Sequence, residues 1–462
     1  MFEQAYTLHV PPAGNLAGHG LAILLMKFGL APETCEKLLM TLCVVGLALA
    51  FRYAVASTNT AHPAASLLVM PFLYNWPMQM GFWSFSLGVP FLLVSIGLCI
   101  KYRGRWTARS LLWLFLAAGL VYLCHPISWA VCGLVIALMA ACGEWRPFLR
   151  GPNRRRALMQ TVLPIAMFVP FAIPNLLFAT QNELVKWDRV LSFRTLLWPL
   201  YTDAPLHIFE SDARAARALF LFLVLASFVT LVARIRSRRL EYPDVLLGAA
   251  ALLFAMGLLS PGRIGEGTFL GVRLLLFGYL VWALWLGLAV RGRMLTGVAL
   301  GTSAIAIWLT VVRLPEWRMA NRELSEVVRL GSVVPEGSYL CEVNFRQDSG
   351  VVMPLEHAVD LLPEKRIVDV RDYEAGRQAF WTSFRPGYFL DQSYLSPATQ
   401  SDFEGAVKTF ENTTGKKLDY IVLLNMKTTP EQSLRALLPA TWSRYEQAGI
   451  DGPVVAFYRL RP

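Results

Sequence analysis

The sequence predicts an α-helical polytopic membrane protein of about ten transmembrane or re-entrant segments, with a C-terminal extracytoplasmic α/β domain. Of its 462 residues, 55% are hydrophobic and 16% are charged, whereas soluble globular proteins carry about 25% charged residues. The apolar residues gather in runs of about 20, the length of a helix that crosses a bilayer. The net charge of +11 arises before residue 315, and the last third of the chain has the composition of a soluble domain.

The apolar runs predict the individual membrane segments. Spans are expected at 37–57, 80–100, 107–124, 126–143, 157–178, 215–235, 243–260, 272–290 and 294–313. A further run at 64–78 is short and contains Pro71 and Pro77, which fits a tilted span or a re-entrant segment. Residues 16–30 are apolar on one face and too short to span easily, which favours an interfacial amphipathic helix.

The distribution of Lys and Arg predicts the orientation. Alternate loops are strongly basic, and Glu144, Glu241 and Asp244 are their acidic residues. Basic loops face the cytoplasm, so residues 315–462 are expected outside a plasma membrane, the inner membrane of a bacterium. The basic residues are Lys101, Arg103, Arg105, Arg109, Arg146, Arg150, Arg154, Arg155, Arg156, Arg234, Arg236, Arg238, Arg239, Arg291 and Arg293.

The same reasoning divides the chain into three parts. Residues 1–35 are predicted to form an extracytoplasmic N-terminal segment with an amphipathic helix, 36–314 the transmembrane domain and 315–462 the soluble domain. The opening MFEQAYTLHV lacks the apolar core of a signal peptide. We therefore expect that an upstream segment with at least one span is missing.

The soluble domain alternates strand and helix patterns. Strands are expected at 338–344, 366–370, 419–424 and 453–459, and helices at 319–331, 400–413 and 430–438. This order is typical of one sheet with helices packed on it. The domain contains no phosphate-binding glycine loop and no nucleophile-elbow motif, which favours recognition or scaffolding over independent chemistry.

The loop 261–273 (PGRIGEGTFLGVR) holds the sharpest candidate site. Arg263, Glu266 and Arg273 lie among glycines between two spans, and Arg273 opens an apolar helix. A guanidinium offers a rigid fork of donors that suits phosphate oxygens, so Arg273 and Arg263 are candidates for binding a lipid phosphate and Glu266 is a candidate cleft residue. The alternatives to phosphate binding are snorkelling to lipid headgroups or an Arg–Glu pair. For Arg263 these alternatives are favoured over phosphate binding.

Two histidines are further candidates for the cleft. His125 lies in a tight outer turn between two spans, and an imidazole can serve as acid, base or phosphate partner. A buried histidine bonded to a backbone carbonyl is the commoner case. His19 lies on the amphipathic segment 16–30 and faces either a cleft or water.

Several function classes and ligands are excluded or unsupported. A nucleic-acid surface would cluster basic residues with aromatics on one soluble face, whereas here they flank apolar runs. The seven cysteines form no CxxC pair and no metal-ligand spacing. No cofactor is evident, and the sequence provides no support for a divalent metal.

The layout resembles the GT-C superfamily of polytopic glycosyltransferases that use polyprenyl-phosphate sugars. Three stretches carry the resemblance: PPAGNLAGHGLAILLMKFGLAPETCEKLLMTL, an outer helix leading into a span; MGFWSFSLGVPFLLVSIGLCIKYRGR, an aromatic helix entry ending in a basic loop; and the late pair of spans with Arg273 followed by an outer domain. The resemblance covers most of the chain and is architectural.

The resemblance implies an inverting transfer. A sugar would leave a polyprenyl phosphate for a glycan or lipid acceptor, with basic residues holding the phosphate and an acidic residue after the first span deprotonating the acceptor. This chain has no Asp before Asp188, and its outer acids before that loop are Glu3, Glu33 and Glu36. No catalytic base is therefore assigned.

Two other classes remain open. A transporter or lipid flippase would also have about ten spans, but such proteins usually show internal repeats and discontinuous helices. An inactive GT-C-like membrane scaffold would explain the missing acidic residue. The expected partners are membrane lipids, a polyprenyl-phosphate-linked sugar and its acceptor.

Overall fold

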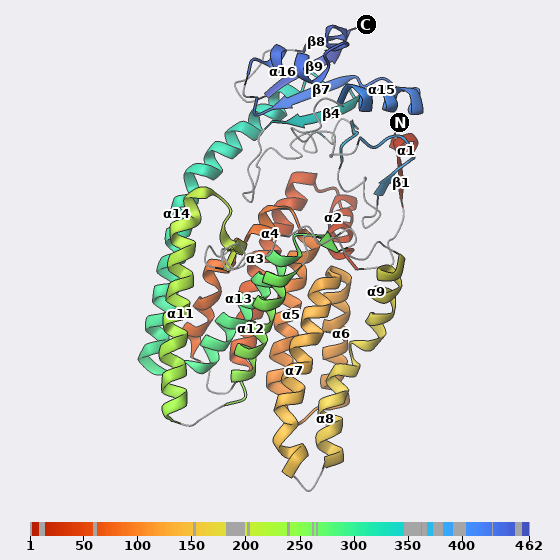
Figure 1. The fold of residues 1–462 in the computed structure, drawn as a ribbon. Coiled ribbons are helices and arrows are strands. Elements are labelled where there is room, and N and C mark those ends of the chain that lie inside the picture. The colour runs from red at the N-terminus through yellow and green to blue at the C-terminus, as the bar shows by residue number, and fades with distance from the viewer. Residues whose placement is uncertain are drawn as a thin grey trace. The chain divides into compact units, whose positions relative to one another are not determined.

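The computed structural model is mostly helical and divides into two compact units (Figure 1). One unit is residues 12–313, and the other combines residues 1–11 with 314–462. Residues 1–11 therefore group with the C-terminal unit, and the sequence analysis did not predict this association. The structure describes residues 2–8, 14–58, 62–150, 154–181, 199–200, 204–237, 241–260, 263–264, 267–345, 362, 367–372, 382–390, 403–426, 428–448 and 455–461.

The unit 12–313 is a bundle of apolar helices. The described elements are α2 (Ala17–Lys27), α3 (Pro32–Ala56), the 3₁₀ helix η1 (Pro63–Phe72), α4 (Trp76–Gln79), α5 (Trp83–Tyr102), α6 (Ala108–Cys124), α7 (Pro126–Arg150), α8 (Arg154–Ala166), α9 (Val169–Gln181), η2 (Ala204–Leu206), η3 (Glu210–Asp212), α11 (Ala213–Arg236), α12 (Asp244–Leu259), the strand pair β2 (Arg263–Ile264) and β3 (Gly267–Thr268), α13 (Leu270–Ala289) and α14 (Gly292–Gly331). A helix lies at each predicted span.

Five of the described helices are long and apolar enough to cross a membrane. They are α3, α5, the helix at 210–236, α13 and α14, and the bent pair of α8 and α9 would make a sixth. The apolar helices α6 and α12 and the apolar part of α7 are shorter. Helices of this length and composition indicate a membrane protein.

The bundle has a buried centre and an apolar exterior. The apolar stretch of α13 is 89% buried, whereas that of the helix at 210–236, which includes α11, is 33% buried. Helix α13 is apolar on all sides, as expected for a helix surrounded by others. On α11, Leu221, Leu225 and Phe228 are more than half exposed, and a bilayer would cover such side chains.

The predicted segment 64–78 is the 3₁₀ helix η1 followed by the short helix α4. It runs alongside α13: Ala65 and Leu68 lie against Gly287, Phe72 stacks on Tyr279 at 5.9 Å, and further along Trp76 meets Phe269. A 3₁₀ helix rises about 2 Å per residue against 1.5 Å in an α-helix. This short segment therefore follows most of the length of α13.

The predicted interfacial helix at 16–30 is α2, which packs on α3, α5 and α6. The amides of Asn15 and Leu16 donate to the Leu123 carbonyl at 3.2 and 2.9 Å. Gly18 donates to Ser84 Oγ at 2.9 Å, and a Cβ at Gly18 would lie 2.8 Å from the same hydroxyl. Only a glycine allows this approach, so α2 is anchored to the bundle.

The helix predicted at 319–331 is not a separate element. It is the end of α14, a continuous helix from Gly292 to Gly331 with Pro315 inside it. A proline removes one backbone hydrogen bond, but the strong helix formers around it keep the helix intact. The division between the two units, at Leu314, falls within this helix.

The second unit contains a mixed five-stranded sheet of order β5-β4-β7-β9-β8. Its strands are β4 (Tyr339–Asn344), β5 (Val368–Asp369), β7 (Tyr420–Leu424), β8 (Tyr445–Gln447) and β9 (Val455–Leu460), with helices α15 (Phe403–Thr414) and α16 (Pro430–Leu437). Strands β5, β4 and β7 are parallel to one another. Strand β9 is antiparallel to both of its neighbours, β7 and β8. The four predicted strands and the two later helices are confirmed.

A second sheet ties the N-terminus to this unit. Helix α1 (Phe2–Ala5) leads into β1 (Tyr6–Leu8), which pairs antiparallel with β6 (Thr382–Phe384). Tyr6 stacks on Phe384 with ring centroids 4.9 Å apart. The sequence analysis missed both strands, since each is three residues long and too short to show a period.

Candidate functional site

The contacts of the bundle define two ends. At the arginine-rich end (residues 101–109, 154–160, 234–237, 241–244 and 290–293), the Arg103 guanidinium lies 3.9 Å from the Tyr242 ring centroid. At the far end (residues 14–18, 73–85, 122–128, 204–213, 267–273 and 311–313), Trp76 contacts Phe269 at 5.0 Å. Arg273 and His125 both lie at the far end.

Arg273 is buried in the first turn of α13. Its side chain is 7% exposed, and its guanidinium carbon lies 4.3 Å from the Phe82 ring centroid and 5.3 Å from that of Phe85. Cation–π contacts of this kind are strongest when water is excluded. The low exposure of Arg273 favours a position within the bundle over snorkelling to lipid headgroups.

His125 meets Arg273 directly, although 148 positions separate them in sequence. Arg273 Nη1 lies 3.1 Å from His125 Nε2. His125 follows the end of α6, and its Nδ1 lies 3.2 Å from the Ile127 amide in the first turn of α7. A neutral imidazole can accept a hydrogen bond at only one nitrogen, so the ring can satisfy either Ile127 or Arg273.

Aromatic side chains surround this pair. Phe85 meets the His125 ring edge-on at 5.4 Å, and Phe82 is 6.0 Å from Trp76 and 6.3 Å from Phe269. Phe269 has φ of 56°, a left-handed conformation that is strained for an aromatic residue. We call Trp76, Phe82, Phe85 and Phe269 the aromatic cluster. The sequence analysis missed it, although Phe82 and Phe85 lie in the aromatic helix entry noted there.

The other predicted site residues are placed less fully. His19 is half-buried on α2, which packs at the far end beside Ser84. Arg263 lies in β2, which pairs with β3, and its side chain is outside the described residues, as is all of Glu266. The structure therefore brings Arg273 and His125 together and leaves the roles of Arg263 and Glu266 as predictions.

A buried ion pair also lies at the far end. Asp212 is fully buried and accepts from Arg313 Nε at 3.0 Å and from the amides of Ile208 and Phe209 at 2.9 and 3.1 Å. Arg313 also donates to the carbonyl of Tyr74 at 3.0 Å. This carboxylate is held by a cation and two amides, which fits a clamp joining three segments rather than a base.

His207 lies beside this clamp and outside the helices. Burial lowers the pKa of His207, and the nearby Asp212 carboxylate acts in the opposite direction. Desolvation disfavours the charged imidazolium and wins here. His207 is therefore a neutral side chain at ordinary pH.

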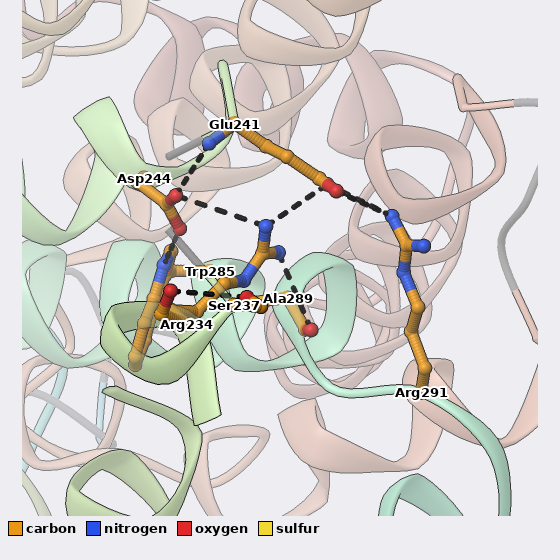
Figure 2. Close-up of polar contacts among 7 residues, drawn as sticks. All are labelled: Arg234, Ser237, Glu241, Asp244, Trp285, Ala289 and Arg291. Atoms are coloured by element: carbon orange, nitrogen blue, oxygen red, sulfur yellow. Dashed lines mark hydrogen bonds and ion pairs between the residues drawn. The ribbon is translucent and has the colours of Figure 1, made fainter. Parts of the chain in front are cut away.

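Figure 2 shows the polar network at the arginine-rich end. Arg234 is 8% exposed and pairs with Glu241 at 3.1 Å and Asp244 at 3.8 Å. Burial would raise the pKa of Glu241, but its hydrogen bonds and ion pairs with Arg234 and Arg291 lower it below the ordinary value. Two of the three acidic residues in the basic loops thus compensate a buried arginine.

Comparisons with known proteins do not identify a family for this chain. No protein-family model matches the chain, and no curated protein is significantly similar to it. Among the described residues, no three His, Cys, Asp or Glu side chains come together as a metal site requires. The site is therefore interpreted from its own chemistry.

Proposed function

We propose that this chain is a membrane glycosyltransferase-like protein that transfers a sugar from a lipid-phosphate donor to an extracytoplasmic acceptor, with Arg273 and His125 holding the donor phosphate. The observation that carries the proposal is the buried contact between these two side chains inside the aromatic cluster. No residue is assigned as the catalytic base, and the role proposed for Arg273 and His125 is donor binding.

The chemistry of the pair suits a phosphate. When His125 Nδ1 accepts from Ile127, its Nε2 carries the proton, and that N–H and a guanidinium N–H converge at 3.1 Å. A phosphate oxygen that accepts from both would satisfy them together. Aromatic surroundings exclude water and strengthen such bonds.

The position of the pair suits a lipid-linked substrate. Arg273 lies in the first turn of α13, so its charge is at the end of an apolar helix, where lipid headgroups are found. The positive end of the helix dipole adds to the attraction for an anion. The rings of the aromatic cluster offer an apolar surface for the neighbouring polyprenyl chain.

The path of η1 along α13 is consistent with a topology that has the C-terminal unit outside, which this function requires. If η1 with α4 crosses the membrane alongside α13, the chain crosses ten times, with α8 and α9 together as one crossing. Helix α3 then begins outside, and the C-terminal unit is delivered outside as well. The basic residues at the arginine-rich end are cytoplasmic under this assignment.

Binding of a polyprenyl phosphate to the purified protein tests the site. Arg273→Lys keeps the charge but loses the bidentate fork, so binding should weaken, and Arg273→Ala should weaken it by roughly ten- to hundredfold, the effect of losing a charged hydrogen bond. The matched control is Arg214→Ala, because Arg214 is exposed in the first turn of α11 at the same end. Unchanged binding by Arg273→Ala would refute the proposal.

A second measurement separates the three classes of function. Proteoliposomes are supplied with a lipid-phosphate sugar and an acceptor, and the fate of the lipid is followed. A transferase releases polyprenyl phosphate, a flippase moves the intact lipid across the bilayer, and a scaffold does neither. Release that is lost in Arg273→Ala and retained in Arg214→Ala supports the transferase.

A further inference from the structure

Trp76 carries a buried hydrogen-bond donor that has no acceptor. The side chain is 5% exposed, and its Nε1 makes no hydrogen bond within the described part of the chain. Trp282 and Trp285 are also buried, and they donate to Ser227 Oγ at 2.7 Å and to Asp244 Oδ1 at 3.0 Å. Because a buried indole N–H usually finds a partner, the unused donor of Trp76 indicates a partner that the described residues do not supply.

The backbone around Trp76 is held in place. Trp76 opens α4, and Asn75 before it is 4% exposed. The Asn75 side chain accepts from the Met78 amide at 3.1 Å and donates to the Phe72 carbonyl at 3.0 Å. These bonds cap α4 and tie it to the end of η1, so the indole is presented from a fixed element.

Trp76 lies one ring away from the Arg273 guanidinium. Its ring meets those of Phe82 at 6.0 Å and Phe269 at 5.0 Å. The ring of Phe82 carries the guanidinium carbon at 4.3 Å, and the Phe269 carbonyl accepts from the Arg273 amide at 3.3 Å. Phe269 is 44% exposed, so the aromatic cluster reaches the surface at a direct neighbour of Trp76. The unused N–H therefore belongs to the surroundings of the proposed phosphate site.

A phosphate has a use for a further donor at this site. The phosphate of a lipid-linked sugar has two non-bridging oxygens, and both can only accept hydrogen bonds. One of them accepts from Arg273 and His125 together in the proposed site, and the second needs another donor because the aromatic rings exclude water. An indole N–H can only donate, so it suits a phosphate oxygen. A buried water would need two to four polar partners, and the Trp76 side chain offers one.

We propose that the Trp76 indole N–H is a further binding group for the lipid phosphate, donating to the non-bridging oxygen that Arg273 and His125 leave unused. The inference rests on the proposed function, and it adds a residue that the sequence analysis did not single out. The backbone of Phe269, whose φ is 56°, holds its ring against Trp76. Strained backbone of this kind gathers at ligand sites.

Binding of three probes to the full chain in detergent tests the proposal. They are polyprenyl phosphate, the matching polyprenol and inorganic phosphate. Trp76→Phe keeps an aromatic ring and removes the N–H, so polyprenyl phosphate binding should weaken about tenfold, the effect of one hydrogen bond to a charged group. Polyprenol binding should stay nearly unchanged. Equal losses for the two lipids would mean that Trp76 acts by packing and would overturn the proposal. Inorganic phosphate bound as tightly as the lipid would overturn it in favour of a free-anion site.

Arg273→Ala, measured with the same probes, separates this inference from the proposed function. Losses in both variants, confined to the phosphate lipid, support the proposal. If Arg273→Ala loses polyprenyl phosphate binding and Trp76→Phe retains it, the phosphate site stands and the role of Trp76 is refuted. If both variants retain it, the phosphate site itself is refuted.

Trp282→Phe is the matched control. Trp282 is 6% exposed on α13, and its N–H already has a partner in Ser227. Both replacements remove the same atoms, so the two melting temperatures compare a used N–H with an unused one in the ligand-free protein. Trp282→Phe should melt at a lower temperature than Trp76→Phe and should retain polyprenyl phosphate binding. Equal melting temperatures would mean that the Trp76 N–H is satisfied without a ligand, against the proposal.

Nuclear magnetic resonance of the parent keeps the test decisive if Trp76→Phe does not fold. In protein that carries isotope-labelled tryptophan, the Trp76 N–H is identified by its cross-peaks to the rings of Phe82 and Phe269. Its proton resonance should move downfield when polyprenyl phosphate is added, because a new hydrogen bond to an anion deshields the proton, and should stay in place with polyprenol. An unchanged resonance at saturating polyprenyl phosphate would overturn the proposal.

Discussion

Arg234 and Arg273 lie at opposite ends of one helical bundle, and they are similarly buried among different described neighbours. Arg234 is 8% exposed and Arg273 is 7% exposed. Arg234 pairs with the carboxylates of Glu241 and Asp244 and donates to the Ala289 carbonyl at 3.4 Å (Figure 2). Arg273 contacts an imidazole and two aromatic rings.

The difference separates a structural charge from a candidate ligand-binding one. A buried charge is tolerated when opposite charges and hydrogen bonds replace the water that it loses. Carboxylates neutralise Arg234, so its positive field is largely cancelled within the network. The described contacts of Arg273 are with an imidazole and two aromatic rings, and an anionic substrate is the partner that we propose for its charge.

The largest expected effect concerns Arg313, the buried arginine that pairs with Asp212 at the same end as Arg273. Arg313→Met should destabilise the bundle by about 3–5 kcal/mol, because it strands a fully buried carboxylate. Thermal unfolding in detergent measures the change. Asp212→Asn should restore part of the loss in the double variant, since the amide oxygen can still accept from Ile208 and Phe209. An additive double variant would show that the two side chains act independently.

Methionine substitutions test the comparison itself. Arg234→Met should cost about 3 kcal/mol, since Glu241 and Asp244 lose a buried partner. Arg273→Met should change stability by less than about 1 kcal/mol or raise it, because an apolar side chain suits the aromatic cluster. Melting temperatures of the two variants give the answer in one experiment. A large loss in Arg273→Met would mean that its charge is also structural.

A buried acid in the second unit extends the comparison to pH. Asp369 is 6% exposed, and burial raises its pKa to about 7, although the nearby Arg371 charge opposes the shift. The folded state then holds a proton that the unfolded state releases above the ordinary value of 3.8. The stabilisation is present below that value and is lost as pH rises through about 7.

Hydrogen exchange in the β4 and β5 peptides measures this dependence. The parent and Asp369→Asn are compared at the same pH, so that the intrinsic exchange rate cancels. The variant should be better protected than the parent at pH values well above 7, and the difference should shrink in acid, where both carry a neutral side chain. Equal protection at alkaline pH would mean that the carboxylate is stabilised by neighbours when ionised.

The sequence predicted the parts of the fold that depend on local pattern. Apolar runs of about 20 residues located the membrane helices, and short apolar runs located β4, β7 and β9, because each pattern repeats within one element. The continuous α14 and the 3₁₀ form of η1 were not predicted. Both depend on how a proline-containing segment packs against its neighbours, which overrides local propensity.

The candidate site was predicted in part for the same reason. Arg273 and His125 were each singled out by their position at helix ends, but their contact joins residues 148 apart, and no local pattern encodes it. The Asp212–Arg313 pair joins residues 101 apart and was likewise missed. Arg234 and Glu241 are close in the sequence, so the acidic residues of the basic loops offered a signal for their pairing.

The smallest expected effect comes from Arg291, which shares Glu241 with Arg234. Arg291 is 64% exposed, and its Nη2 lies 2.8 and 2.9 Å from the two carboxylate oxygens (Figure 2). Because water screens an exposed pair, Arg291→Ala should cost about 0.2–1 kcal/mol, well below the loss for Arg234. High salt should reduce the Arg291 effect further and leave the Arg234 effect nearly unchanged. If instead the two losses are similar, then the shared carboxylate, rather than the burial of its partner, sets the strength of the network.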